Sequence, residues 1–268
     1  MKKTLLKLLC LVLALTLLCG CAPSVDETVE ALQQLGQSPD DQYRTWYEIF
    51  VYSFCDSNGD GIGDLKGVTQ KLDYLQEMGI TGIWLMPIHP SSSYHKYNVA
   101  DYYAIDPAYG TLEDMDNLLA ECEKRNIRVI MDLVLNHTAN NHEWFLTAAE
   151  FLKNLPEGAQ PNAEECPYVD YYFFNQEGGS GYHAVPGSSW YYEGQFSPDM
   201  PDLNLGNGLV RQEIDAIMAF WLGRGVHGFR LDAAKEFYTG QVSMNQEVLA
   251  WIQETARAYT VMSERCLR

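Results

Sequence analysis

Two carboxylic acids and one arginine stand at the ends of short apolar segments. Arg230 and Asp232 are two residues apart in the segment GFRLD, so on a strand their side chains share one face. A guanidinium beside a carboxylate keeps the carboxylate ionised, as a nucleophile requires. Glu264 closes the apolar run TVMS. Across a barrel from Asp232, it would complete the carboxyl pair that cleaves glycosidic bonds. The alternatives are that Arg230 and Asp232 form a structural salt bridge, and that Glu264 only caps a strand.

An amide and an imidazole end another apolar segment, DLVLNH at 132–137. His137 suits a hydrogen bond to a sugar hydroxyl, and a satisfied histidine at a loop edge is the alternative. Aromatic residues make up 12% of the chain and are concentrated in predicted loops. Sugars stack on such rings through their C–H faces. Core packing explains many of these aromatic residues, but their place in loops favours a carbohydrate cleft.

Oxygen-bearing side chains alternate with other residues in the loop DSNGDGIGD at 56–64. Its first half matches an EF-hand loop, but Gly67 stands at position twelve, where a bidentate glutamate is required, so an EF-hand is excluded. We expect calcium in another loop geometry, with a solvated acidic turn as the alternative. The expected ligands are Asp56, Asn58, Asp60, Ile62 and Asp64.

These residues must be positioned by an alternation of strands and helices. Apolar runs predict strands at 46–54, 80–88, 128–135, 226–232 and 260–264. Apolar residues at intervals of three and four predict helices at 65–78, 112–125, 209–222 and 245–258. This alternation is typical of a parallel α/β architecture, and in a (β/α)8 barrel the chemistry lies at the C-terminal ends of the strands. The stretch 138–208 is rich in Tyr, Pro, Gly and Asn and is interpreted as an inserted subdomain.

The N-terminus predicts export. Residues 1–20 have a basic start and an apolar stretch at 8–18 that is too short to span a bilayer, which indicates a secretory signal peptide. The segment LCGC at 18–21 resembles a bacterial lipobox, in which Cys21 would be lipidated; a plain cleaved signal is the alternative. Residues 22–42 are a polar, acidic spacer. We therefore expect a protein that is lipid-anchored to the bacterial cell envelope.

Composition sets the class of the protein. With 268 residues, 47% hydrophobic content and a net charge of −18, the chain fits a globular domain. Nucleic acid is excluded as a partner, because its phosphates need a basic face. None of the seven cysteines forms a pair with metal-ligand spacing.

Taken together, these segments resemble the α-amylase family of glycoside hydrolases from about residue 43 to the C-terminus. Five segments carry the resemblance in family order: YHKYNVADYYAIDPAYGT at 94–111, DLVLNH at 132–137, MPDLN at 200–204, GFRLDAAKE at 228–236 and VMSE at 261–264. The loop DSNGDGIGDLKG resembles that of the oligo-1,6-glucosidase and neopullulanase-like branches.

The resemblance implies a (β/α)8 TIM barrel, of which this chain holds about the first five strands. The barrel would comprise 43–137 and 209–268, with domain B inserted at 138–208 after strand three. Asp232 would be the nucleophile and Glu264 the general acid/base. Arg230 would be the electrostatic partner of Asp232, His137 and Tyr97 would contact the sugar that is cleaved, and Lys235 would lie on the aglycone side. Cleavage would retain configuration, with the two carboxyl groups about 5 Å apart.

Several positions depart from the family pattern. Ser263 stands where glycine is usual, and Asn98 stands where exo-acting members carry an aspartate that holds the terminal sugar. Glu236 replaces a histidine whose carbonyl binds calcium in many α-amylases, which weakens a second calcium site near Asn136 and Asp202. The fourth signature, with the third carboxylate, would lie beyond residue 268.

The expected substrate is a starch-type α-1,4-glucan, and calcium is the expected cofactor. Cleavage of α-1,6 bonds is the alternative specificity. A truncated, inactive lipoprotein that binds glucan is the alternative from another class of function.

Overall fold

The computed structural model describes residues 44–266, and its side chains up to residue 258. The predicted signal peptide at 1–20, the predicted lipidation site Cys21 and the spacer at 22–42 lie outside these residues. The chain divides into two units after Arg44, and the second unit, Thr45–Arg268, holds every element described below.

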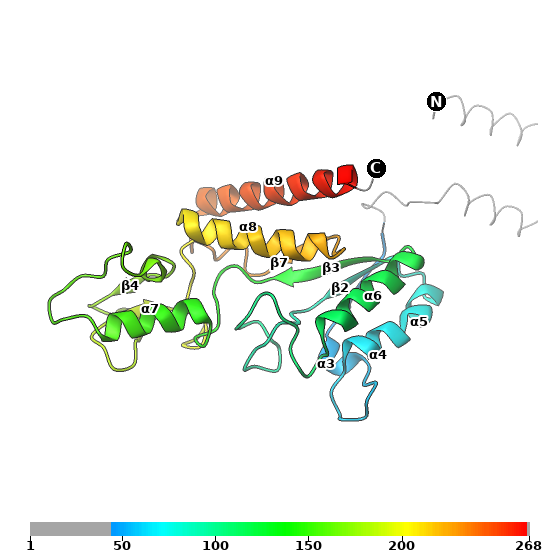
Figure 1. Ribbon diagram of the computed structural model, residues 1–268, viewed down its shortest axis with the longest axis horizontal. Helices are drawn as coiled ribbons and strands as arrows, with labels where there is room; N and C mark the ends of the chain where they lie inside the picture. Colours follow the sequence, from blue (N-terminus) through cyan, green and yellow to red (C-terminus); the bar gives the residue numbers. More distant parts are fainter. Residues whose placement is uncertain (1–43, 267–268) are drawn as a thin grey trace, which may run out of the picture. The chain divides into compact units, whose positions relative to one another are not determined.

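A parallel four-stranded sheet organises this second unit (Figure 1). Its strands lie in the order β1(Trp46–Ile49), β2(Gly82–Leu85), β3(Arg128–Leu133) and β7(Gly228–Leu231). All three pairings are parallel. Four predicted strands are therefore confirmed, although each is shorter than predicted. The first ends at Ile49 because the chain turns into a short helix, α3(Val51–Phe54).

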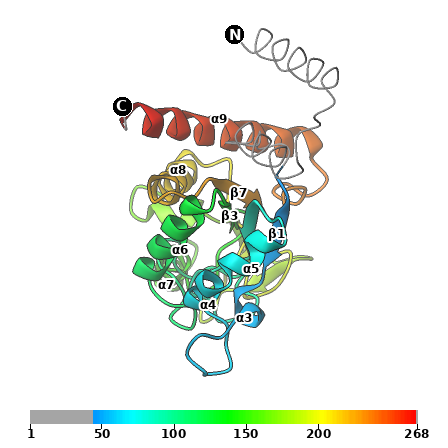
Figure 2. The ribbon, with the colours of Figure 1, turned by 90° about the vertical axis from the view of Figure 1, so that its right-hand side faces the viewer.

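Helices follow the strands in sequence and cover the outside of the sheet, as Figures 1 and 2 show. The first helical prediction is divided at Lys71, which ends one helix and begins the next. The capping box of Thr111 and Asp114 fixes the start of the third. The helices are α4(Leu65–Gln70), α5(Leu72–Glu77), α6(Leu112–Lys124) and α8(Gly208–Gly223).

The core lies between the sheet and these helices. One face of β3 is buried along its whole length: Val129, Met131 and Leu133, which alternate along the strand, are at most 1% exposed. Trp221 of α8 is fully buried and donates its indole N–H to the main-chain oxygen of Tyr102 at 2.9 Å. Parallel strands covered by helices agree with the predicted α/β class and with the first part of a (β/α)8 barrel.

The segment between β3 and α8 forms a separate layer of structure. It contains α7(Glu143–Lys153), the 3-10 helix η2(Pro167–Asp170) and a small antiparallel sheet in the order β4-β6-β5. The strands of that sheet are β4(Phe174–Asn175), β5(Tyr182–Ala184) and β6(Tyr191–Glu193). Phe145 of α7 packs its ring against Tyr172 and Tyr192. Many loop aromatics therefore serve as core residues.

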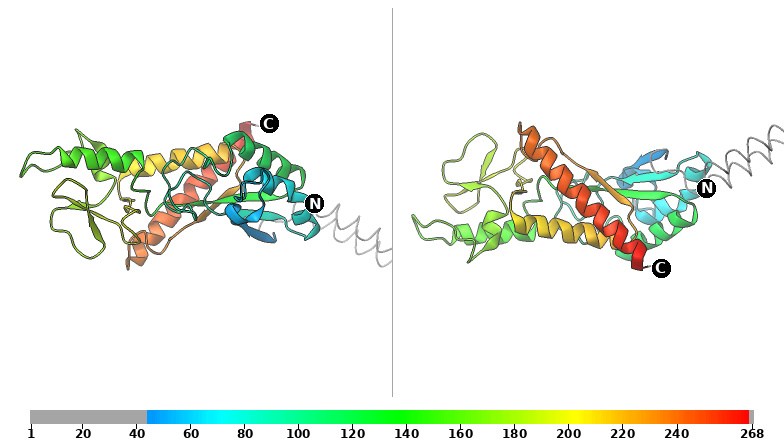
Figure 3. Two further views of the ribbon diagram at one scale, coloured as in Figure 1. Left: turned by 90° about the horizontal axis from the view of Figure 1, so that it is seen from below. Right: turned by 90° about the horizontal axis from the view of Figure 1, so that it is seen from above.

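The predicted strand at 260–264 is wrong. The helix predicted at 245–258 continues through this segment as α9(Val242–Cys266). No glycine or proline lies between 242 and 266 to end a helix. A helix satisfies its backbone hydrogen bonds within itself, whereas a strand needs a neighbour and a reversal of the chain. Figure 3 shows α9 crossing α8, with β7 running beside it.

Two edges of the main sheet stay open in the part of the chain that the structure describes. β1 and β7 each pair with one neighbour. The outer face of β7 is covered by α9, where Phe229 and Leu231 meet Leu249 and Ile252 across a groove.

Among the described residues, no helix has the length and apolar character needed to cross a membrane.

Candidate active site

Arg230 connects two carboxylates at the C-terminal end of the sheet. Its Nη1 donates to Asp232 Oδ1 at 2.6 Å and to Asp132 Oδ1 at 2.8 Å. Arg230 and Asp132 are register neighbours on β7 and β3, and Asp232 directly follows β7. The structure thus places Arg230 and Asp232 together, as the spacing predicted, and adds a second acid beneath them.

Asp132 is the residue that the sequence reasoning missed. Its side chain is completely buried, and it also accepts hydrogen bonds from Trp84 Nε1 at 3.0 Å and the Tyr97 hydroxyl at 3.2 Å. Burial raises the pKa of Asp132 to about 6, although the Arg230 guanidinium opposes the shift. Asp132 opens the motif DLVLNH, so its place at a strand end was the available signal. Its partner Arg230 is 98 residues away.

A pocket of about 730 Å³ opens above this network. Among the residues that line it are Tyr97, Asn98, His137, Phe196, Asp232 and Lys235. Four predicted site residues therefore meet at one cavity, from the loop after β2, the end of β3 and the end of β7. Ala233, directly after the proposed nucleophile, has φ +49°. This left-handed conformation is costly for a residue with a side chain, and such strain is typical of functional sites.

His137 is held as a neutral imidazole. Burial lowers its pKa to about 4. Its Nε2 lies 3.2 Å from the main-chain oxygen of Tyr97, and because a carbonyl oxygen only accepts, Nε2 carries the proton. Its ring contacts Phe196. His137 therefore lines the pocket in a fixed orientation.

Tyr97 and Lys235 differ in exposure to solvent. Tyr97 donates its hydroxyl to Asp132, and burial raises its pKa well above the usual value, so it stays a hydrogen-bond donor at physiological pH. Lys235 has 89% of its side chain exposed and pairs with Glu236 at 3.1 Å. It therefore lies at the rim of the pocket, with its ammonium group in solvent.

Glu264 is not brought to the end of a strand. At 1.5 Å per residue, a straight α9 places its backbone roughly 28 Å along the helix from Asn245, and Asn245 donates to the main-chain oxygen of Lys235 at 2.7 Å. The side chain of Glu264 lies outside the described residues. Among the described residues, the predicted approach of Glu264 to Asp232 is therefore not observed.

The acidic loop at 56–64 is ordered by its own backbone. Asp56 accepts main-chain hydrogen bonds from Asn58, Gly59 and Gly61, and the bonds from Gly61 and Gly59 lower its pKa. Asp60 accepts from the main chain of Ile62.

The side chain of Asp64 has other partners: it caps α4 by accepting the main-chain N–H of Gly67, and it also accepts the main-chain N–H of Ser57. A Cβ atom at Gly67 would lie 1.9 Å from the main-chain oxygen of Cys55, so no glutamate fits at position twelve of this loop. That clash is the physical reason for the departure from an EF-hand.

The oxygen donors of this loop fit a hard cation such as calcium. In the described part of the chain, however, no three His, Cys, Asp or Glu side chains lie together in a way that could hold a metal ion. A site here would therefore rely on the amide of Asn58 and the main-chain oxygen of Ile62 as well as on carboxylates.

Most of the aromatic residues that favoured a sugar cleft are buried in the fold. Tyr94, at 66% exposure, and Tyr103, at 37%, are the clear exceptions, and Tyr97 faces the pocket. The buried ones are Tyr102, Tyr109, Tyr171, Tyr172, Trp190 and Tyr192. Aromatic density alone was thus a weak guide to the cleft.

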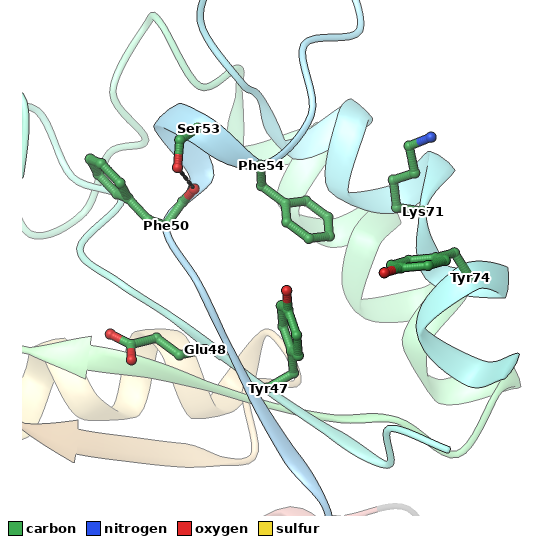
Figure 4. A pocket seen from close by; sticks show the side chains of 7 residues that line it. All are labelled: Tyr47, Glu48, Phe50, Ser53, Phe54, Lys71 and Tyr74. Atoms are coloured by element: carbon green, nitrogen blue, oxygen red, sulfur yellow. Dashed lines mark hydrogen bonds between the residues drawn. The ribbon is translucent and has the colours of Figure 1, made fainter. Parts of the chain in front are cut away.

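A second pocket, of about 550 Å³, lies on the outer side of β1 (Figure 4). The rings of Tyr47, Phe54 and Tyr74 turn toward one another there, while Glu48 lies on the opposite side of the strand. Lys71 points its ammonium group away from the rings. The pocket offers no pair of carboxyl groups, so it does not compete with the Asp232 pocket as a site of hydrolysis.

Comparison with known proteins matches residues 48–260 to the family model described as "Alpha amylase, catalytic domain". Alpha-amylase 3 of Dictyoglomus thermophilum is 46% identical over 197 residues, which are 72% of this chain and 37% of that protein. Glucan 1,6-alpha-glucosidase of Streptococcus pneumoniae is 45% identical over 195 residues, which are 69% of this chain and 34% of that protein.

Among solved structures, Eubacterium rectale Amy13B is 55% identical with a TM-score of 0.79. That alignment covers 81% of this chain and 42% of the other. The chain thus spans about a third of the length of the two curated relatives.

Proposed function

Because this chain belongs to the alpha-amylase family of glycoside hydrolases, we propose that it cleaves α-glucans in the pocket that Asp232 lines. One observation carries the proposal: the guanidinium of Arg230 bridges Asp232 and the buried Asp132 at 2.6 and 2.8 Å. This arrangement holds a carboxyl group in a fixed place at the floor of an open cavity.

The proposed reaction begins with attack of an Asp232 oxygen on the anomeric carbon of the sugar. The bond from that carbon to the glycosidic oxygen breaks, and the leaving oxygen takes a proton from a carboxylic acid. Water then attacks the same carbon and gives a proton to the carboxylate that the acid has become. This step breaks the bond between the sugar and Asp232. Two inversions at one carbon retain its configuration. The network beneath Asp232 supports this role, because the hydrogen bond from Arg230 fixes the position of the attacking carboxyl group.

Glu264 is the proposed acid, and this role requires a different conformation of its segment. Residues 260–264 would have to leave α9 and pair with β7, whose outer edge has no strand partner among the described residues. The exposed main-chain groups of that edge make it a template for another strand. The role of Glu264 therefore stays a prediction.

The proposed substrate is an internal α-1,4 bond of a starch-type glucan. Asn98 lines the pocket and is only 2% exposed. Its amide oxygen accepts from Ser91 and Ser93, and its amide nitrogen donates to Ser92. The charged anchor for a terminal sugar that the family places here is therefore replaced by a neutral amide bound to serines, which favours cleavage within a chain. The relatives named above include an amylase and a 1,6-glucosidase, so α-1,6 cleavage is the competing specificity.

A panel of glucans tests this proposal. We expect release of reducing sugar from soluble starch and maltooligosaccharides, with slower release from isomaltose and pullulan. Release from isomaltose alone would overturn the α-1,4 assignment. Retention of the chain on a starch gel without any release, equal for wild type and Asp232→Asn, would support a glucan-binding protein without hydrolase activity.

Calcium is proposed to bind the loop at 56–64, and its removal should destabilise the fold. Excess EDTA should lower the melting temperature by roughly 5 °C or more, as expected when a ligand well above its Kd is removed. Differential scanning calorimetry with and without 1 mM calcium would measure the change. Asp60→Asn should lose most of this dependence, whereas Asp73→Asn, an exposed acid outside the loop, should keep it. Equal melting temperatures of the wild type in both buffers would refute the calcium site.

Export and lipidation at Cys21 are also proposed, on the basis of the apolar N-terminal stretch and the lipobox-like LCGC. Mass spectrometry of the mature N-terminus checks both. An unmodified Cys21 after a plain cleavage would reject the lipid anchor.

A further inference from the structure

Gln195 connects three segments that meet beside the active-site pocket. Its main-chain N–H donates to Asp202 Oδ2 at 2.9 Å. Its side-chain Nε2 donates to Asn136 Oδ1 at 3.3 Å and to the main-chain oxygen of Glu236 at 2.9 Å. Its Oε1 accepts from the hydroxyl of Thr239 at 2.6 Å. Gln195 therefore forms a hydrogen bond with each of four residues: Asn136, Asp202, Glu236 and Thr239.

The three segments carry the active-site framework. Asn136 ends the β3 segment next to His137, and Glu236 lies four residues after Asp232. Asp202 comes from the segment between β6 and α8, where it also accepts from Asn136 Nδ2 at 2.9 Å. Asn136 and Asp202 are 2% and 5% exposed, so this side of the junction is buried, whereas Gln195 and Glu236 are half-buried and Thr239 is exposed.

Three acceptor oxygens from separate segments are the kind of set that a hard cation collects. The family resemblance places a second calcium near Asn136 and Asp202. In this structure, however, each of the three oxygens accepts an N–H of Gln195. The amide nitrogen Nε2 lies 3.3 Å from Asn136 Oδ1 and 2.9 Å from the Glu236 oxygen, and it takes the place between these oxygens that a cation would need. The residues of this junction therefore do not fit a metal ion.

We propose that Gln195 replaces a metal ion at this junction: its side-chain amide holds Asn136 and the loop after Asp232, and its main-chain N–H holds Asp202. An amide N–H group supplies a partial positive charge to each acceptor, as an ion would, with directional hydrogen bonds. Gln195 is in this sense a positioning residue. The junction needs no metal because its donor is part of the chain.

The charge-changing variant Gln195→Glu tests this proposal. A glutamate would place a carboxylate among three acceptor oxygens and remove the donor, so the fold should become dependent on a cation. In EDTA the melting temperature of the full-length variant should fall by about 4–8 °C. Millimolar calcium should restore at least half of this loss. Every comparison is made with wild type in the same buffer, so any effect of the loop at 56–64 cancels.

The matched control is Gln195→Leu, which removes the three side-chain hydrogen bonds, keeps the main-chain bond to Asp202 and cannot bind a cation. It should lose a similar amount of thermal stability, and calcium should restore none of the loss relative to wild type. A merely structural role for residue 195 would make the two variants respond alike to calcium. That result contradicts the proposal.

Two further outcomes are decisive. If calcium raises the melting temperature of wild type more than that of Gln195→Leu, an ion binds at the junction with Gln195 as a ligand, and the proposal fails. It also fails if Gln195→Glu remains unfolded in both buffers, whereas folding only with calcium supports it. Because these measurements use no glucan, they are independent of whether the chain hydrolyses one.

Discussion

Replacing Asp232 by asparagine should reduce glucan hydrolysis by at least about 10³-fold, with little change in stability. The asparagine side chain has nearly the same shape, and its amide oxygen can still accept the 2.6 Å hydrogen bond from Arg230. The amide is a poor nucleophile, however, so the covalent step is lost. Initial rates on maltooligosaccharides, measured for matched amounts of folded protein, give the comparison.

Asp116→Asn is the matched control for this variant. Asp116 is also an aspartate paired with an arginine, Arg224, at 2.7 Å, but it lies on α6 and does not line the pocket. Its substitution should leave the rate within about twofold, because exposed ion pairs contribute little. Retention of more than a tenth of the activity by Asp232→Asn would remove Asp232 from the role of nucleophile.

Replacing Arg230 by methionine should lower the free energy of unfolding by about 3 kcal/mol at pH 8. Asp132, with its side chain completely buried, would lose its cationic partner and keep the hydrogen bonds from Trp84 and Tyr97. Methionine retains most of the aliphatic volume, so the loss reports on charge more than on packing.

The deficit of Arg230→Met should depend on pH with a definite sign. In the wild type, the pKa of Asp132 is raised from 3.8 to about 6, so the folded state binds more protons than the unfolded state between these values. Stability from this group is present at low pH and is lost as the pH rises through about 6. Without Arg230, the pKa of Asp132 in the folded state rises further, so the pH range over which stability is lost extends above 6. The variant should therefore lose more free energy of unfolding, relative to wild type, at pH 8 than at pH 5.

Urea unfolding at pH 5, 6.5 and 8 measures this dependence. The control is Arg224→Met, which breaks the exposed pair with Asp116 and should cost less than about 1 kcal/mol at each pH. A deficit for Arg230→Met that is equal at pH 5 and pH 8 would show that Asp132 does not titrate in the way its surroundings predict.

The sequence by itself determined the alternation of strands and helices and the residues at the strand ends. Arg230 and Asp232 share a face because side chains alternate every two residues along a strand, a rule that needs no knowledge of the rest of the fold. The helices around 112–125 and 209–222 were predictable for the same reason, since apolar residues at intervals of three and four define a buried helical face. The family motifs added the order in which these elements carry functional residues.

The tertiary structure decided what surrounds those residues. Asp132 and Arg230 are 98 residues apart, and only the parallel pairing of β3 with β7 makes them neighbours. Gln195 had no motif of its own, because its significance lies in acceptors that include two distant segments, at Asn136 and Glu236. Residues 260–264 have the composition of a strand and form part of α9 instead. Local sequence patterns show only whether apolar residues recur every two or every 3.6 residues. A paired strand, a buried ion pair or the Gln195 junction also requires partners that the chain brings together only when it folds.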